Sequence, residues 1–142
     1  MASGASEKLV LGIDIGTTDA KCSIYDLAGT PVASAYREYS MIHPREGWVE
    51  EDPNIWWSTV VANLQSCLHD SKLDPARIAA IGVSCTNAFF PLDRDGNPLH
   101  NAILQLDQRA ASEVDWIREH IGSERIFRVT GNRIARGTFA LP

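Results

Sequence analysis

The sequence has no excess of positive charge, few cysteines and no long hydrophobic run at its start. It carries 13 Lys and Arg against 18 Asp and Glu, which gives a net charge of -5. Because no basic field is available to attract a phosphate backbone, we expect no nucleic-acid partner. Residues 1–6 are small and polar with no apolar core to follow, so we expect neither a secretory signal nor a membrane anchor. A cytoplasmic location without a membrane partner is the resulting prediction.

The three cysteines are odd in number and far apart, at Cys22, Cys67 and Cys85. This spacing fits neither a disulfide framework nor a zinc site with paired ligands. We expect all three to be buried thiols in a reducing compartment. The four histidines also lie apart, at no metal-ligand spacing, and we expect each at the surface. They are His43, His69, His100 and His120.

The remaining composition is that of an ordinary folded domain. Of the 142 residues, 44% are hydrophobic and 22% are charged, which allows one core of respectable size. Short apolar runs at 8–15, 22–27 and 32–39 are separated by turn residues and predict a meander of three strands. Gly29 lies in the second gap, where a tight hairpin needs a positive φ.

A long helix is predicted after these strands. Asp52 can cap it, Pro53 fits its first turn, and it should end near Asp70. Its apolar side chains recur at 3- and 4-residue spacing, at Trp56, Val60, Leu64, Cys67 and Leu68. We therefore expect the helix to lie on a sheet face, with Trp56 in the core.

Further strands are predicted in the second half of the chain. Residues 78–83 are apolar almost throughout, as in a strand that is buried on both faces. The pair Asp95-Gly96 is a strong turn signal, so a hairpin should lead from 89–92 to 102–104.

A last helix is predicted over residues 110–121, where apolar residues form a helical stripe. Gly122 is well placed to stop it. The resulting order is β-β-β-α-β-β-β-α, which indicates a mixed α/β domain. No internal repeat and no obvious linker divides the chain.

The stretch LGIDIGTTDAK, at residues 11–21, places Asp14 among glycines where the first strand ends. Glycines such as Gly16 let another group approach the backbone closely, and consecutive turn N–H groups can form an anion-binding nest. The hydroxyls of Thr17 and Thr18 would add donors to the same concavity. The turn therefore fits the end of a polyphosphate.

A carboxylate beside a phosphate makes sense only if a cation lies between them. Mg²⁺ is held in this way, by one or two carboxylates, waters and substrate oxygens, so Asp14 would be its ligand. An ordinary hairpin is the alternative interpretation, because Asp and Gly populate such turns for conformational reasons alone. The stretch lacks the Gly-Lys-Ser/Thr ending of a P-loop and the Gly-x-Gly-x-x-Gly of a dinucleotide site. Its spacing alone leaves both interpretations open.

Together with later segments, this stretch resembles a known family. LGIDIGTTDAK looks like the first phosphate motif of the actin, heat-shock and sugar-kinase superfamily. GWVEEDPNIWW at 47–57 and AILQLDQR at 102–109 are similar to segments of FGGY carbohydrate kinases, and VTGN at 129–132 fits a later element. The resemblance runs from about Val10 to the end of the chain.

The resemblance implies a fold of the α/β class. This is the ribonuclease-H-like (actin/hexokinase) fold, a mixed sheet with flanking helices, and here it would be incomplete. Residues 1–8 would form a disordered N-terminal tail. Residues 9–142 would form an N-terminal FGGY kinase domain that is truncated at its C-terminal end.

The chemistry implied by the resemblance is phosphoryl transfer. The full-length parent would move the γ-phosphoryl of ATP to a sugar or polyol hydroxyl with the help of Mg²⁺. Asp14 would engage Mg²⁺, directly or through water, while Gly16, Thr17 and Thr18 would hold phosphate oxygens. Lys21 would add positive potential nearby, although a lysine on a strand is more often simply solvated.

The acceptor site is implied by two segments. Residues 84–90 read SCTNAFF where xylulose-acting members carry Gln-Met-His-Gly and glycerol kinases carry Gln-Arg-Glu-Thr. Ala88 stands where the His or Glu should fall, which sets the chain apart from both groups. The resemblance implies that Asn87, Asp107 and Arg109 contact the sugar. From the residues alone, a strand-end Asn and a helix-capping Asp are equally good interpretations.

The family's general base and adenine-binding glycines lie downstream of the matched segments. No residue of this chain is assigned as the base, and we expect the 142-residue chain alone to lack turnover. A non-catalytic sugar-binding or assembly module is one alternative function, and another actin-like ATPase of the superfamily is a second. A homodimer of the full-length protein is compatible with the resemblance. Trp48, in a polar loop, is open to sugar stacking or to packing.

Overall fold

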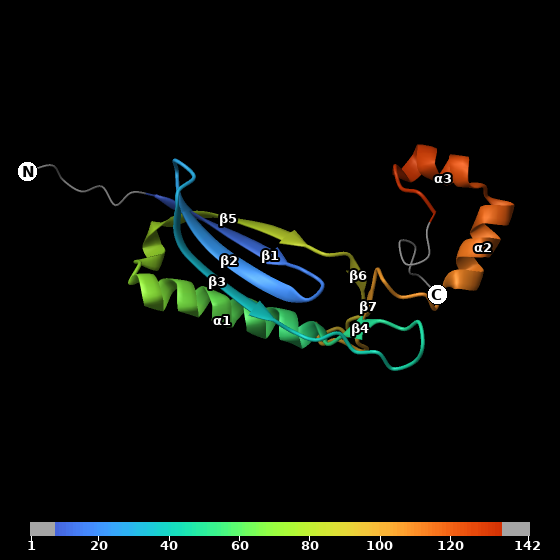
Figure 1. Ribbon diagram of the computed structural model, residues 1–142, viewed down its shortest axis with the longest axis horizontal. Coiled ribbons are helices and arrows are strands. Elements are labelled where there is room, and N and C mark those ends of the chain that lie inside the picture. Colours follow the sequence, from blue (N-terminus) through green and yellow to red (C-terminus); the bar gives the residue numbers. More distant parts are fainter. Residues whose placement is uncertain (1–7, 135–142) are drawn as a thin grey trace, which may run out of the picture. The chain divides into compact units, whose positions relative to one another are not determined.

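The computed structural model describes residues 8–134, which form two compact units (Figure 1). The first unit comprises residues 8–40 and 54–86, and the second comprises 41–53 and 87–134. The chain passes from the first unit to the second and back, so the units alternate along the sequence. Of the tail expected at 1–8, only Lys8 is among the described residues. The predicted domain boundaries stay a prediction.

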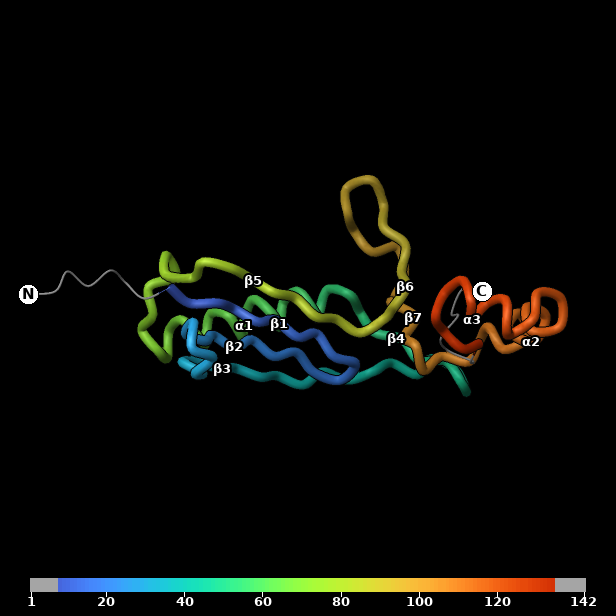
Figure 2. Tube along the Cα trace, turned by 90° about the horizontal axis from the view of Figure 1, so that it is seen from above, coloured from blue at the N-terminus to red at the C-terminus, as the bar shows by residue number. Residues whose placement is uncertain are grey.

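The first unit is built on a four-stranded mixed sheet with the order β3-β2-β1-β5, whose strands lie side by side in Figure 2. β1 pairs antiparallel with β2 and parallel with β5, and β2 pairs antiparallel with β3. The predicted meander is confirmed, and Gly29 has the expected positive φ of 85°. The strands are β1 (Leu9–Ile15), β2 (Asp19–Asp26), β3 (Pro31–Glu38) and β5 (Ile78–Cys85).

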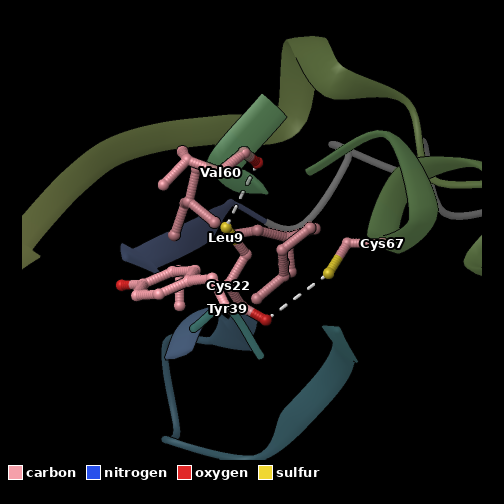
Figure 3. Packing of buried hydrophobic residues seen from close by; sticks show 8 residues of the cluster. Leu9, Cys22, Tyr39, Val60 and Cys67 are labelled. Carbon is pink, nitrogen blue, oxygen red and sulfur yellow. Dashed lines mark hydrogen bonds between the residues drawn. The ribbon is translucent and has the colours of Figure 1, made fainter. Parts of the chain in front are cut away.

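Helix α1 (Pro53–Ser71) lies along one face of this sheet (Figure 1). Alternate residues of a strand point to the same face, so every second residue of β1 and β2 faces the helix. Trp56 is partly buried and packs against the resulting core, as predicted. A short 3₁₀ turn, η1 (Pro75–Arg77), leads from the helix region into β5. The buried core consists of Leu9, Leu11, Ala20, Cys22, Ile24, Tyr39, Val60 and Cys67 (Figure 3).

One polar side chain on α1 is fully buried and joins three elements. Asn63 donates from Nδ2 to the carbonyl of Ala20 on β2 at 2.7 Å, and its Oδ1 accepts from Nη1 of Arg37 on β3 at 2.6 Å. Both ends of the amide therefore have partners, as a buried polar group requires. Because Ala20 directly follows the first residue of β2, this bond fixes the start of that strand.

The prediction that residues 78–83 are buried on both faces is wrong. Ile81 and Val83 are 62% and 65% exposed. β5 is an edge strand, and in the part of the chain that the structure describes β1 is its strand partner. An apolar run predicts a strand, but it does not say which elements cover that strand.

The cysteine prediction is confirmed for two residues and wrong for the third. Cys22 and Cys67 are buried in the core, whereas Cys85, the last residue of the edge strand β5, is exposed. All four histidines are exposed, as predicted. Within residues 8–134, no helix combines the length and apolar character needed to cross a membrane.

The second unit contains a three-stranded antiparallel sheet with the order β4-β7-β6. The predicted hairpin is confirmed, since β6 pairs with β7 and Gly96 has a φ of 86° in the loop between them. The two-residue strand β4 and helix α3 were not predicted, although Gly122 does stop α2. The elements are β4 (Glu50–Glu51), β6 (Ala88–Phe89), β7 (Ala102–Leu104), α2 (Ala111–His120) and α3 (Ser123–Thr130).

Candidate functional site

The turn between β1 and β2, residues Gly16–Asp19, is tight. Gly16 N–H donates to the carbonyl of Asp19 at 2.8 Å. A Cβ atom on Gly16 would lie 3.1 Å from that same carbonyl oxygen, which is closer than side chains normally tolerate. A hairpin turn is therefore present, and glycine fits it because a side chain at position 16 would crowd the Asp19 carbonyl.

Asp14 lies just before this turn, is exposed, and pairs with a residue on each side. Its cross-strand neighbours are Lys21 on β2 and Ser84 on β5. Directly opposed residues share a face of the sheet. The sheet therefore brings the carboxylate and the predicted lysine to one surface.

A cavity of about 450 Å³ opens on this surface, and Asp14, Lys21 and Ser84 all line it. Gly12 and Gly82, which are register partners on β1 and β5, form part of its floor. Glycine carries no Cβ, so the backbone is accessible there. The site therefore combines one carboxylate, one ammonium group and open backbone.

The two threonines of the turn have different surroundings. The hydroxyl of Thr17 lies 3.2 Å from the hydroxyl of Thr86. The backbone N–H of Thr86 donates to the carbonyl of Ile15 at 2.8 Å. The hydroxyl of Thr18 donates to the carboxylate of Asp19 at 3.3 Å. Thr86 was not predicted as a member of this site, because only the parallel register of β1 and β5 places it beside Thr17.

These donors fit a magnesium–phosphate group better than an all-protein metal cage. Among residues 8–134, no three His, Cys, Asp or Glu side chains are grouped as metal ligands. Mg²⁺ commonly takes one or two carboxylates and completes its shell with water and phosphate oxygens. Asp14 could offer such a carboxylate, and the N–H and hydroxyl groups of the turn could act as donors to phosphate oxygens.

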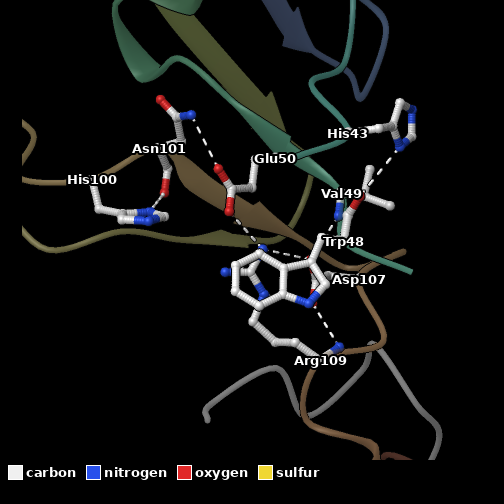
Figure 4. Close-up of polar contacts among 8 residues, drawn as sticks. All are labelled: His43, Trp48, Val49, Glu50, His100, Asn101, Asp107 and Arg109. Carbon is white, nitrogen blue, oxygen red and sulfur yellow. Dashed lines mark hydrogen bonds and ion pairs between the residues drawn. The ribbon is translucent and has the colours of Figure 1, made fainter. Parts of the chain in front are cut away.

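The second unit contains a buried ionic network around Asp107 (Figure 4). Oδ2 of Asp107 accepts from Val49 N–H at 2.6 Å and from Nη2 of Arg109 at 2.8 Å. Oδ1 accepts from both the backbone N–H and Nε of Arg109 at 2.8 Å. With an exposed fraction of 1%, Asp107 is held entirely within this network.

Glu50 on β4 completes the network. Its Oε1 accepts from Nη2 of Arg109 at 2.7 Å, and its Oε2 accepts from Asn101 at 3.0 Å. The guanidinium carbon of Arg109 lies 3.8 Å from the ring centre of Trp48 (Figure 4), within cation–π range. Trp48 therefore packs on an arginine. Spacing did not predict the role of Glu50, because Glu50 is followed by Glu51 and Asp52, and such an acidic run is usually solvated.

The network keeps both carboxylates ionised. Burial acts to raise the pKa of Asp107, but hydrogen bonds from Arg109 and from Val49 N–H outweigh it and hold that pKa below its ordinary value. Burial likewise acts to raise the pKa of Glu50, and bonds from Arg109 and Asn101 lower it overall. The hydrogen bond to Asp107 in turn raises the pKa of Arg109.

These depressed pKa values predict an acid-sensitive second unit. A carboxylate with a lower pKa in the folded state stabilises the fold above its unfolded pKa, about 3.9 to 4.3, and this contribution is lost as pH falls through the folded value. We expect the free energy of unfolding, measured with urea from pH 6 to pH 2, to fall below about pH 4. Asp107→Asn should flatten this acid limb. An unchanged limb in the variant would contradict the assignment.

The predicted site residues divide between the two units. Asp14, Gly16, Thr17, Thr18 and Lys21 lie in the first unit, close to one another. The predicted sugar residues Asn87, Asp107 and Arg109 lie in the second unit. Asn87 is exposed just before β6, whereas Asp107 and Arg109 bond to each other. Their contact with a sugar stays a prediction.

Residues 9–141 match the N-terminal domain of the FGGY family of carbohydrate kinases. The chain belongs to this family. The resemblance stated from the sequence motifs is thereby confirmed, together with the α/β fold class.

Named relatives within the FGGY family differ in substrate. The chain is 38% identical over 120 residues to glycerol kinase 5 of Gallus gallus, covering 82% of this chain and 23% of that protein. It is 34% identical over 134 residues to xylulose kinase of Staphylococcus xylosus, covering 94% of this chain and 27% of that protein. The chain therefore spans about a quarter of the length of these relatives.

A solved structure shows the same arrangement of the backbone. The xylulose kinase from Rhodospirillum rubrum superposes with a TM-score of 0.82 at 32% sequence identity. The match covers 92% of this chain and 27% of that kinase. The FGGY fold is thus shared over nearly the whole of this chain.

Proposed function

We propose that this chain is the N-terminal phosphate- and acceptor-binding portion of an ATP-dependent carbohydrate kinase. The full-length parent would phosphorylate a hydroxyl of a sugar or polyol. The observation that carries the proposal is the exposed Asp14 beside the tight Gly16–Asp19 turn, in a chain of the FGGY family. The general base would lie outside this chain. A cytoplasmic location and a small-molecule acceptor belong to the same proposal.

The phosphate side of the proposal rests on the first unit. Asp14 would hold Mg²⁺, directly or through water, and the turn with Thr17 and Thr18 would bind phosphate oxygens. When bound, Mg²⁺ would neutralise negative charge on the phosphate oxygens. Lys21 shares the face of Asp14 and adds positive charge there. Phosphoryl transfer depends mainly on such positioning and charge neutralisation.

The acceptor side of the proposal rests on the second unit. Asn87 carries an exposed amide, which can both donate to and accept from hydroxyls. The side-chain hydrogen bonds of Arg109 within the described residues use Nε and Nη2, which leaves the Nη1 hydrogens for a sugar oxygen. Both oxygens of Asp107 already accept bonds, so Asp107 would act by holding Arg109 in place.

Titration of the ¹⁵N-labelled chain with Mg·ATP tests the phosphate assignment. We expect Mg²⁺-dependent shift changes at the amides of Gly16, Thr17 and Thr18. Asp14→Asn should weaken binding by about tenfold or more, because loss of even an outer-shell partner costs a metal site about that much. Asp70→Asn, which alters an exposed acid on α1, is the control and should bind normally.

Two results would contradict the proposal. One is equal affinity in the wild-type chain and Asp14→Asn, and the other is a set of shifted amides far from the turn. Binding of a sugar to a chain that gives no response to Mg·ATP would instead support the non-catalytic module.

A further inference from the structure

We propose that Tyr39 is a positioning residue for the phosphate turn. Its hydroxyl gathers the carbonyl groups of Gly16 and Asp19 on one side, so that the N–H group of Thr17 faces the other side, where an anion can bind. This inference rests on the proposed function of the turn. Neither the sequence motifs nor the family match assigns a role to Tyr39.

Three carbonyl groups of the turn contact Tyr39. Its hydroxyl lies 2.7 Å from the carbonyl oxygen of Gly16 and 2.6 Å from that of Asp19. Its backbone N–H donates to the carbonyl of Thr18 at 2.9 Å. The single hydroxyl proton is shared between two acceptors at the two ends of the turn. Tyr39 therefore holds both ends and one of the central residues.

Because each peptide group is planar and trans, these contacts also fix the direction of backbone N–H groups in the turn. In a trans peptide, the carbonyl and the following N–H point in opposite directions. Because the Gly16 carbonyl points to Tyr39, the Thr17 N–H points away from it. The Thr18 carbonyl points instead to the backbone nitrogen of Tyr39, which anchors the middle of the turn to the end of β3. The Thr17 N–H is thereby aimed at the side opposite the Tyr39 hydroxyl, where it can contribute to an anion-binding nest.

The ring of Tyr39 gives this contact a rigid base. Tyr39 is 8% exposed and belongs to the core cluster with Leu9, Cys22 and Val60 (Figure 3). The packed ring fixes where the hydroxyl lies, and a site is held best when its supporting residues are locked by packing. The turn itself is too short to supply such support.

Tyr36 provides a matched control on the neighbouring strand β3. It is 53% exposed, and its hydroxyl donates to the carboxylate of Glu38 at 2.8 Å. Tyr36→Phe and Tyr39→Phe each remove a phenolic hydroxyl. The hydroxyl of Tyr36 lies at the surface, and that of Tyr39 contacts the turn. Both variants keep the aromatic ring.

Amide hydrogen exchange without ligand is the first test. Tyr39→Phe should speed the exchange of Gly16 N–H by about fivefold to tenfold, the value of one hydrogen bond, while Ile24 on β2 changes less. Tyr36→Phe should leave Gly16 unchanged. Equal exchange at Gly16 in the wild-type chain and Tyr39→Phe would overturn the proposal.

A second variant keeps the test decisive if Tyr39→Phe folds poorly. The chain with 3-fluorotyrosine at position 39 retains the hydroxyl and makes it a stronger donor. Exchange at Gly16 should then become slower. No change at Gly16 in this variant would count against the proposal.

Affinity for Mg·ATP distinguishes positioning from simple stabilisation. Tyr39→Phe should raise the Kd by about tenfold, and Tyr36→Phe should not change it. A less stable Tyr39→Phe chain with wild-type affinity would overturn the positioning role. If the wild-type chain shows no response to Mg·ATP at the turn, the assignment of this turn to phosphate fails, while the exchange data still decide whether Tyr39 orders the turn.

Discussion

Arg109→Met is expected to destabilise the second unit by about 3 to 5 kcal/mol, because it removes one partner of a buried ionic network. Glu50 and Asp107 would remain 3% and 1% exposed without the guanidinium that both carboxylates contact. Methionine keeps much of the volume, so the loss reports the unpaired charges rather than a cavity. Urea unfolding at pH 7, followed by far-UV circular dichroism, measures the change.

Arg118→Met is the matched control for this prediction. Arg118 pairs with Asp115 on α2, and the two side chains are 45% and 44% exposed. Exposed pairs contribute about 0 to 1 kcal/mol, so the control should lose little. Equal losses in the two variants would mean that the network around Arg109 is not buried in solution. A large loss in Arg109→Met alone would show that Arg109 supports the fold, whatever it contacts in a complex.

The core of the first unit could be predicted from the sequence because its signals are local. The alternation of Ala20, Cys22 and Ile24 on β2, and the 3- and 4-residue spacing on α1, follow from the periods of strand and helix. The Gly16–Asp19 turn was also visible, because glycine and small hydroxyl residues are local signals. The prediction of Asp14, Thr17 and Thr18 as site residues rests on the same local signals.

The rest depends on partners that are far apart in the chain. Glu50 accepts from Arg109, 59 residues away, and from Asn101, 51 residues away, and these contacts satisfy the buried glutamate on its two-residue strand. Tyr39 contacts Gly16, which is 23 residues away in the sequence, and Thr86 contacts Thr17, which is 69 residues away. Spacing rules describe faces of single elements. They do not give the register that brings two elements together.

Ile24→Ala is expected to reduce the stability of the first unit by about 2 to 5 kcal/mol, measured as the free energy of unfolding in urea. Ile24 is fully buried in the middle of the sheet, opposite Leu11 on β1 and Ala33 on β3. Removing its outer carbons loses their transfer free energy and leaves a cavity that a sheet paired on both sides cannot close. Ile24→Val should cost only about 0.5 to 1.5 kcal/mol, because it removes a single methylene.

Leu27→Ala is the control for Ile24→Ala, because it shortens an exposed aliphatic side chain instead of a buried one. Leu27 lies just after β2, only three positions from Ile24, and is 71% exposed. Ile24→Ala and Leu27→Ala delete the same number of carbon atoms, one set from the core and one from the surface. We expect Leu27→Ala to stay within about 0.5 kcal/mol of the wild-type chain. A similar loss in both variants would mean that Ile24 does not face α1, and the register that places Asp14 beside Lys21 would fail with it.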